Sequence, residues 1–213
     1  ARPSTEQGNR HIIAMLEEGM PLVTTAYYVP GQSLTVVDVD NVDGGFQAVN
    51  CLISAGHTRI AMIAGAEGWK SVDDRTQGYR IALKQAGITP DPALIEYSNW
   101  SYEGGHRAVQ RLLERGVPFT ALFAQNDNMA IGAIRGLHEA GLHVPNVIAL
   151  VGYDDIPAAA YSYPPLSTIR QPMQLVGEVA ARLLIETIEN PNAEKKEVLL
   201  KSEFIRRVSC GSR

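Results

Sequence analysis

The chain has 213 residues, of which 45% are apolar and 20% charged, a balance typical of a globular protein that folds in water. Its net charge of −4 provides no basic excess, so this segment by itself is not expected to hold a nucleic acid backbone. No apolar run reaches about 18 residues and no basic, apolar leader is recognisable, so we expect neither a membrane span nor a signal peptide.

The predicted elements alternate between strand and helix. Short, uniformly apolar runs are typical of strands buried on both faces, whereas apolar residues three or four positions apart predict helices. In chain order we expect a helix around 12–16, strands at 21–25 and 34–39, a helix over 48–53, a strand at 60–64, a helix over 74–86, a strand at 93–97, a helix over 108–113, a strand at 119–124, a helix over 129–137, a strand at 147–151, a helix over 176–184, and strands at 197–200 and 204–208.

This alternation predicts an α/β fold with doubly wound parallel sheets. Segments 34–39, 48–53 and 60–64 are expected to form one βαβ unit.

Two adjacent carboxylates, Asp154 and Asp155, follow the strand predicted at 147–151. Open α/β sheets bind ligands at the carboxyl ends of their strands, where the loops diverge. One carboxylate can cap the following turn while the other accepts hydrogen bonds from a ligand. The sequence therefore predicts a ligand-binding cleft at this edge.

Motifs for catalysis and metal binding are missing from the sequence. It contains no Gly-x-Ser-x-Gly element, P-loop or Gly-x-Gly-x-x-Gly element, and its five histidines have no metal-ligand spacing. The Asp73-Asp74 and Asp154-Asp155 pairs are not matched by a nucleophile. We therefore expect no catalytic residue, metal or cofactor, and an enzyme acting on a sugar is the least favoured of three classes.

The cysteines are Cys51, on an apolar helical face, and Cys210, in the polar tail. They are far apart in the sequence, and no spacing indicates a disulfide framework. Two free thiols in a cytoplasmic protein are the expected state.

Five motifs in order resemble the effector-binding core of the lactose-repressor/galactose-repressor (LacI/GalR) family of bacterial transcription regulators. Each is weak alone, but together they cover nearly the whole chain. They are Asp38-Val39-Asp40-Asn41 with Gly44-Gly45, the Gly-His turn within Leu52–Ala61, Arg75-Thr76-Gln77-Gly78-Tyr79, Asn126-Asp127-Asn128-Met129-Ala130, and Gly152-Tyr153-Asp154-Asp155 with Pro164-Pro165-Leu166-Ser167-Thr168.

The resemblance implies two lobes of the periplasmic-binding-protein type I. Residues 1–65 and 170–190 are expected to form a partial first lobe, and residues 66–169 and 191–213 the second. Crossings between lobes are expected near Gly65, Ile169 and Asn190, with the helix after Pro172 returning to the first lobe. The DNA-binding headpiece and several first-lobe strands of the family have no counterpart in this chain.

The resemblance further implies a transcriptional repressor: a cytoplasmic homodimer whose core binds a sugar or sugar derivative between its lobes and whose headpiece binds operator DNA. The alternative is an exported sugar-binding protein of a transport system, which shares the bilobal architecture.

Three polar residues are predicted to bind the ligand, Arg75 and Asp154 from the resemblance and Asn126 from its place at the carboxyl end of the strand at 119–124. The guanidinium of Arg75 can donate two hydrogen bonds to ligand hydroxyls or to a carboxylate, although an exposed surface arginine is the simpler alternative. Asn126 can both donate and accept, and Asp127 beside it is expected to cap the helix. Asp154 is the expected acceptor, with a turn residue as the alternative.

Aromatic and first-lobe residues complete the predicted site. Trp100 lies in a polar loop, where its ring can stack on a sugar or base, with core packing as the alternative. Trp69 and Ser71 occupy family positions that vary with the ligand, and a tryptophan in place of a charge favours an uncharged, cyclic ligand. Asp40 or Asp43 can add a contact from the first lobe or cap the following helix.

Overall fold

Helices and strands alternate through the computed structural model, which describes the backbone of residues 6–211 and the side chains of residues 10–211. The helices are α1 (Glu6–Glu17), α2 (Asn41–Ser54), α3 (Lys70–Gln85), α4 (Tyr102–Glu114), α5 (Asp127–Glu139), α6 (Pro157–Tyr161) and α7 (Met173–Glu189), with a short 3-10 turn η1 (Pro92–Leu94). The strands are β1 (Val23–Thr25), β2 (Thr35–Val39), β3 (Ile60–Ala64), β4 (Ile95–Tyr97), β5 (Ala121–Ala124), β6 (Ala149–Val151), β7 (Thr168–Arg170), β8 (Glu197–Leu200) and β9 (Glu203–Ile205). In this part of the chain every helix is too short or too polar to traverse a lipid bilayer.

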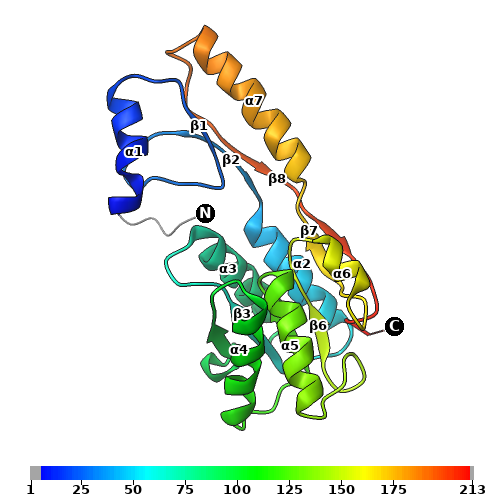
Figure 1. Cartoon of the computed structure of the whole chain (residues 1–213). Helices are drawn as coiled ribbons and strands as arrows, with labels where there is room; N and C mark the ends of the chain where they lie inside the picture. The colour runs from blue at the N-terminus through cyan, green and yellow to red at the C-terminus, as the bar shows by residue number, and fades with distance from the viewer. Residues whose placement is uncertain (1–5, 212–213) are drawn as a thin grey trace.

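The first lobe is a parallel sheet of order β1-β2-β8 with a helix on each face (Figure 1). Successive side chains of a strand point to opposite faces. Val36 of β2 accordingly packs in a cluster with Ile12 of α1, whereas Val37 packs with Val176 of α7. The fully buried strand β2 is therefore covered on both sides.

The second lobe is a parallel sheet of order β4-β3-β5-β6. Met62 of β3 packs with Leu52 of α2 and Leu83 of α3 on one face, whereas Ile63 packs with Leu112 of α4 on the other. Helix α5 covers the same face as α4. The α/β fold with parallel, doubly wound sheets is confirmed.

The expected βαβ unit over 34–64 is wrong, because β2 and β3 lie in different sheets. Strand β2 pairs with β1 and β8, and β3 pairs with β4 and β5. Helix α2 instead leads into the second lobe and packs against α3, where Gly45 and Gly78 let the two backbones touch. Alternation of elements predicts layers but does not say which sheet a strand joins.

The sheet pairing also moves the lobe boundaries from the expected residues. The chain crosses between β2 and α2, between β7 and α7, and between β8 and β9. The crossings expected near Gly65 and Asn190 therefore lie near residues 40 and 201, while the one near Ile169 lies close to its expected place. We propose lobes of residues 6–40 with 172–200 and residues 41–171 with 201–211, in place of 1–65 with 170–190 and 66–169 with 191–213.

Two short elements, α6 and β7, have no counterpart among the expected ones. Strand β7 pairs with β9 antiparallel, with Ile169 opposite Phe204, and single bridges join Val151 to Ser167 and Asp154 to Arg170. These contacts attach the β7-β9 ribbon to β6. The helix after Pro172 contacts β1 and β2, so its predicted return to the first lobe agrees with the structure.

Gly78→Ala is expected to lower the free energy of unfolding by about 1–3 kcal/mol, because the new methyl group would overlap the α2 backbone at Val42 and Phe46. Urea denaturation followed by circular dichroism measures the change. Gly177→Ala on α7 is the matched control: it is a helical glycine with open space around it, and alanine there should be neutral or stabilise by up to about 1 kcal/mol. Equal losses in the two variants would contradict close packing of α2 on α3.

Candidate ligand-binding site

The predicted polar residues gather at the carboxyl edge of the second sheet. Arg75 lies on α3, which follows β3, and Trp100, Asn126 and Asp154 follow β4, β5 and β6. In the order β4-β3-β5-β6 the connection from β3 runs to one side, to β4, and the connection from β5 runs to the other, to β6, so a topological switch point lies between β3 and β5 at this edge. The structure therefore brings together residues that are up to 79 positions apart in the chain.

Arg75 is buried at the centre of this cluster, with 6% of its surface exposed, so the exposed-arginine alternative is wrong. Its Nε donates to Asn41 Oδ1 at 2.9 Å and its Nη1 to the carbonyl oxygen of Gln125 at 2.5 Å. The carboxylate of Asp154 lies 4.0 Å from Nη1. A buried guanidinium needs such partners, because loss of hydration without them is costly.

Aromatic rings surround the same guanidinium. Its central carbon lies 3.7 Å from the ring centroid of Tyr153 and 5.9 Å from that of Trp100. Trp69 meets Trp100 edge to face, with centroids 5.9 Å apart and planes at 62°. Both tryptophans are partly buried, so each keeps some surface accessible beside the cation.

The position of Trp100 depends on its backbone and on Gly65. Its φ of 68° lies in the left-handed region that non-glycine residues seldom adopt. A Cβ at residue 65 would overlap the Trp100 ring, so glycine is required for the ring to lie there. The indole Nε1 is buried and has no hydrogen-bond partner among the described residues.

Asn126, and not Asp127, caps helix α5. Its Oδ1 accepts from the backbone N–H of Met129 at 2.9 Å, and its Nδ2 donates to the carbonyl oxygen of Trp100 at 3.0 Å. The prediction that Asp127 forms the cap is wrong because Asn126 has the extended backbone of the cap position and Asp127 is already helical. Asn126 thus links the loop after β4 to the start of α5.

Asp154 has a φ of 115°, which directs the turn after β6. Its Oδ1 accepts from Gln171 Nε2 at 2.5 Å. Burial raises the pKa of this carboxyl above its usual value, and Arg75 and Gln171 oppose that rise. Asp154 is thus a carboxylate next to a cation, with 29% of its side chain exposed.

Asp155 serves a different purpose. Its two oxygens accept from Arg170 Nε at 2.7 Å and Arg207 Nη2 at 2.6 Å. Burial raises the pKa of Asp155, but the hydrogen bonds from Arg207 and Arg170 outweigh it and hold the pKa below its ordinary value. Asp155 therefore joins the turn, β7 and the C-terminal tail.

Asp127 is fully buried beneath the turn. Its Oδ1 accepts from the Thr168 hydroxyl at 2.6 Å and its Oδ2 from the backbone N–H of Ile156 at 2.9 Å. Burial raises the pKa of Asp127 to about 7, because these two hydrogen bonds only partly replace the lost hydration. The carboxylate that accepts from the N–H of Ile156, the residue before α6, is thus Asp127 rather than either member of the Asp154-Asp155 pair.

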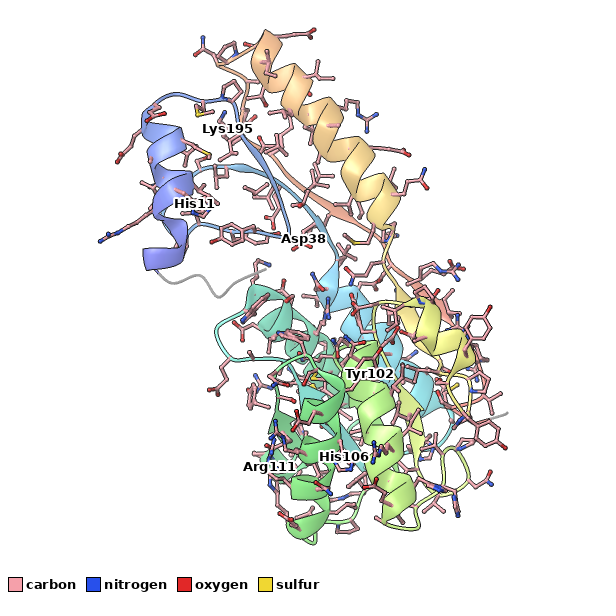
Figure 2. The ribbon with its side chains drawn as sticks, in the orientation of Figure 1. His11, Asp38, Tyr102, His106, Arg111 and Lys195 are labelled. Atoms are coloured by element: carbon pink, nitrogen blue, oxygen red, sulfur yellow. The ribbon has the colours of Figure 1, made fainter. Side chains whose placement is uncertain are left out.

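First-lobe residues meet this edge where β2 ends. Asp40 caps α2 by accepting from the Asp43 N–H at 2.9 Å, which is the capping alternative for that residue. Figure 2 shows Asp38 at the junction of the lobes, and burial raises the pKa of its carboxyl. Lys70 lies 4.6 Å from the ring centroid of Tyr28, so the first turn of α3 contacts the loop between β1 and β2.

Ser71 lies in the first turn of α3, partly buried, and among the described residues no polar contact ties it to the Arg75 cluster. Four residues that the sequence did not single out do join the cluster: Asn41, Gln125, Tyr153 and Gln171. Asn41 and Tyr153 lie within two of the family motifs, Gln125 directly precedes a third, and Gln171 lies three residues after Thr168, so nearness to a motif was the available signal. Among the described residues, no three His, Cys, Asp or Glu side chains are grouped to hold a metal ion.

The fold agrees with those of known proteins. Residues 49–210 match the periplasmic binding protein-like domain family. The HTH-type transcriptional regulator CelR of Thermobifida fusca is 39% identical over 85% of this chain and 53% of its own length. A solved CelR-cellobiose complex superposes with a TM-score of 0.86 at 38% identity, covering 92% of this chain and 60% of that one.

A sugar-binding transcriptional regulator of the LacI family from Escherichia coli, complexed with phosphate, has a TM-score of 0.84 at 33% identity, covering 96% of this chain and 73% of that one. The chain belongs to the periplasmic binding protein-like domain family and is similar to part of LacI-family regulators. It spans about half the length of the curated relatives it matches.

Asp127→Asn is expected to change how stability depends on pH. The folded-state pKa of about 7 exceeds the unfolded value of about 3.9, so the native state binds the extra proton and wild-type stability falls as pH rises between these values. The asparagine variant lacks this fall, of at most about 1.4 kcal/mol per pH unit. Urea denaturation at pH 4, 5.5 and 7 measures the difference.

Asp155→Asn provides the control of opposite sign. The lowered pKa of Asp155 stabilises the folded state at pH values above the unfolded pKa, and this stabilisation is lost as pH falls through the folded pKa. Asp155→Asn should therefore be less stable than wild type at neutral pH, and the difference should shrink as pH falls. Parallel pH profiles for wild type and Asp127→Asn would disprove the assignment of a buried, protonated carboxyl.

Proposed function

We propose that this chain senses a small molecule and controls a DNA-binding transcriptional repressor of the LacI family. The observation that carries the proposal is the Arg75 cluster at the edge where the second sheet meets the first lobe. Arg75, Asn126 and Asp154 supply donors and acceptors, and Trp100 and Trp69 supply ring faces. Such a set matches a polyol ring, which has hydroxyls on its rim and apolar faces.

The charges favour a neutral ligand, such as an unphosphorylated sugar or sugar derivative. Arg75 is engaged by Asn41 and Gln125, and Lys70 pairs with Asp74 at 2.6 Å. Asp38, Asp40 and Asp154 add negative charge nearby, so a sugar phosphate or uronate would meet repulsion. Ser71 and Asp40 complete the residues that we assign to ligand binding. The CelR relative crystallised with cellobiose supports a neutral saccharide.

Regulation requires that the ligand bind one interlobe angle better than another, because a ligand with equal affinity for both shifts nothing. Two crossings end in the cluster: Asn41 begins α2 and contacts Arg75, and Gln171 precedes α7 and contacts Asp154. A ligand held by Arg75 and Asp154 would therefore act on both crossings. We propose that a headpiece outside this chain binds operator DNA in the cytoplasm.

The runner-up is an exported sugar-binding protein of a transport system. Both candidates bind ligand with the same kinds of residue, and the regulators among the relatives favour the first. The relatives are regulators and not enzymes, which supports a role in binding without catalysis.

The test uses the full-length parent protein. A thermal-shift screen against neutral saccharides, sugar phosphates, uronates and nucleosides identifies a stabilising ligand, and operator binding is then measured with and without it. Stabilisation by a neutral saccharide together with altered DNA affinity supports the proposal. A ligand that stabilises a protein without DNA affinity would favour the transport protein instead.

Arg75→Ala is expected to weaken binding of that ligand by about 1–3 kcal/mol, the range for a lost charged hydrogen bond. Isothermal titration calorimetry measures the loss, and circular dichroism verifies folding, since Arg75 also holds Asn41. The matched control is Arg80→Ala, an exposed arginine one turn further along α3. Unchanged affinity in a folded Arg75→Ala variant would remove Arg75 from the site.

We also propose that the parent protein is a homodimer joined through the face around α6. Tyr161 and Tyr163 are 89% and 93% exposed, and Tyr163 lines an apolar hollow of about 420 Å³ together with Leu142. Exposed aromatic groups next to a hollow on one surface fit the self-complementary contact of a two-fold dimer.

Tyr163→Asp is expected to weaken dimerisation at least tenfold, because it would place a charge in that contact. Sedimentation equilibrium of the full-length protein measures the dissociation constant. Tyr102→Asp, on α4, is the control at another exposed tyrosine (Figure 2). A monomeric wild type, or equal effects of both substitutions, would refute this interface.

A further inference from the structure

The two cysteines meet in the folded protein. Cys51 lies in the last turn of α2, and Cys210 lies in the tail that follows β9. Both are free, buried and part of one core cluster, with 8% and 0% of their surfaces exposed. The sequence predicted free thiols, which agrees with the structure, but their position next to each other was not predicted.

One cation serves both sulfur atoms. The guanidinium of Arg206 approaches Cys51 Sγ through Nη2 at 3.5 Å and Cys210 Sγ through Nη1 at 3.7 Å. A cation at this range stabilises a thiolate, which is the reactive form of cysteine. Neither sulfur nor Arg206 belongs to the Arg75 cluster, so the ligand-binding site makes no use of this arrangement.

The two thiols differ in acidity. The hydrogen bond from Cys51 lowers the pKa of Cys210 to about 6, with further help from Ser167 and Arg206 against the effect of burial. The same hydrogen bond, together with burial, raises the pKa of Cys51. Cys210 is thus the more acidic thiol of the pair, and its sulfur also lies 3.8 Å from the carbonyl oxygen of Arg207 and 3.7 Å from that of Gly211.

We propose that Cys51 and Cys210 are a peroxide-oxidised thiol pair that closes into a reversible intramolecular disulfide. The Cys210 sulfur attacks one oxygen of a hydroperoxide, the O–O bond breaks, and the leaving oxygen takes up a proton as water or alcohol, leaving a sulfenic acid. The Cys51 sulfur then attacks the Cys210 sulfur and loses its proton. The S–O bond breaks and a second water leaves, so two thiols are oxidised and one peroxide is reduced.

The disulfide would tie the end of α2 to the tail. Helix α2 starts at Asn41, which holds Arg75, and the tail is fastened to the sheet by Ser209, whose hydroxyl donates to Leu150 O at 2.6 Å. The bond closes a loop through most of the second lobe, and a disulfide that closes a long loop lowers the entropy of the unfolded chain most and so stabilises the folded state most. Oxidation should therefore raise the unfolding temperature, by on the order of 10 °C.

The experiment treats the reduced full-length protein with hydrogen peroxide and maps its peptides without reductant. We expect a Cys51–Cys210 linked peptide with a mass lower by about 2 Da, reversed by dithiothreitol. Cys51→Ser should stop at a sulfenic acid on residue 210 that a 1,3-dione traps. Cys210→Ser should leave residue 51 reduced under the same exposure.

Arg206→Ala should slow disulfide formation by about tenfold, whereas Arg182→Ala, at an exposed position on α7, should not change it. Circular dichroism verifies that the variants fold. If a variant does not fold, the peptide map of the oxidised wild-type protein decides whether the disulfide forms. Two thiols that stay reduced, sulfinic acids without a link, or a link only between molecules would each overturn the proposal.

Discussion

The buried guanidinium of Arg75 is the interaction on which the rest of the site depends. Removing a charge from water is costly, so the fold must surround it with acceptors: Asn41, the Gln125 carbonyl and, at 4.0 Å, Asp154. These acceptors come from the start of α2, the end of β5 and the turn after β6. Satisfying one cation therefore fixes three segments relative to one another.

The same arrangement connects the site to the relative placement of the lobes. Asn41 and Gln171 adjoin two of the crossings, and both belong to the Arg75 cluster. The contact of Lys70 with Tyr28 adds a link across the junction of the lobes. Of these contacts only that of Lys70 with Tyr28 joins residues of different lobes, so a change in lobe angle must rearrange it. Asn41 and Gln171 instead fasten the second-lobe ends of two crossings to the cluster.

The neighbouring carboxylates differ in function because their surroundings differ. Asp154 faces Arg75 and remains partly exposed, Asp155 is neutralised by Arg170 and Arg207, and Asp127 is buried among neutral donors. The first is the one that we propose for ligand binding, whereas the other two hold the turn, β7 and the tail together.

The sequence by itself determined the alternating α/β pattern, most strand positions and the family motifs, because these follow from local periodicity and short-range turns. It placed Arg75, Asn126, Trp100 and Asp154 at one edge, since parallel strands present their carboxyl ends together. Only the tertiary structure decided that β2 and β3 belong to different sheets, that Asn126 caps α5, and that Cys51 meets Cys210. Those outcomes depend on which distant segments pack together, and a residue's partners across such contacts leave no signal in the local pattern.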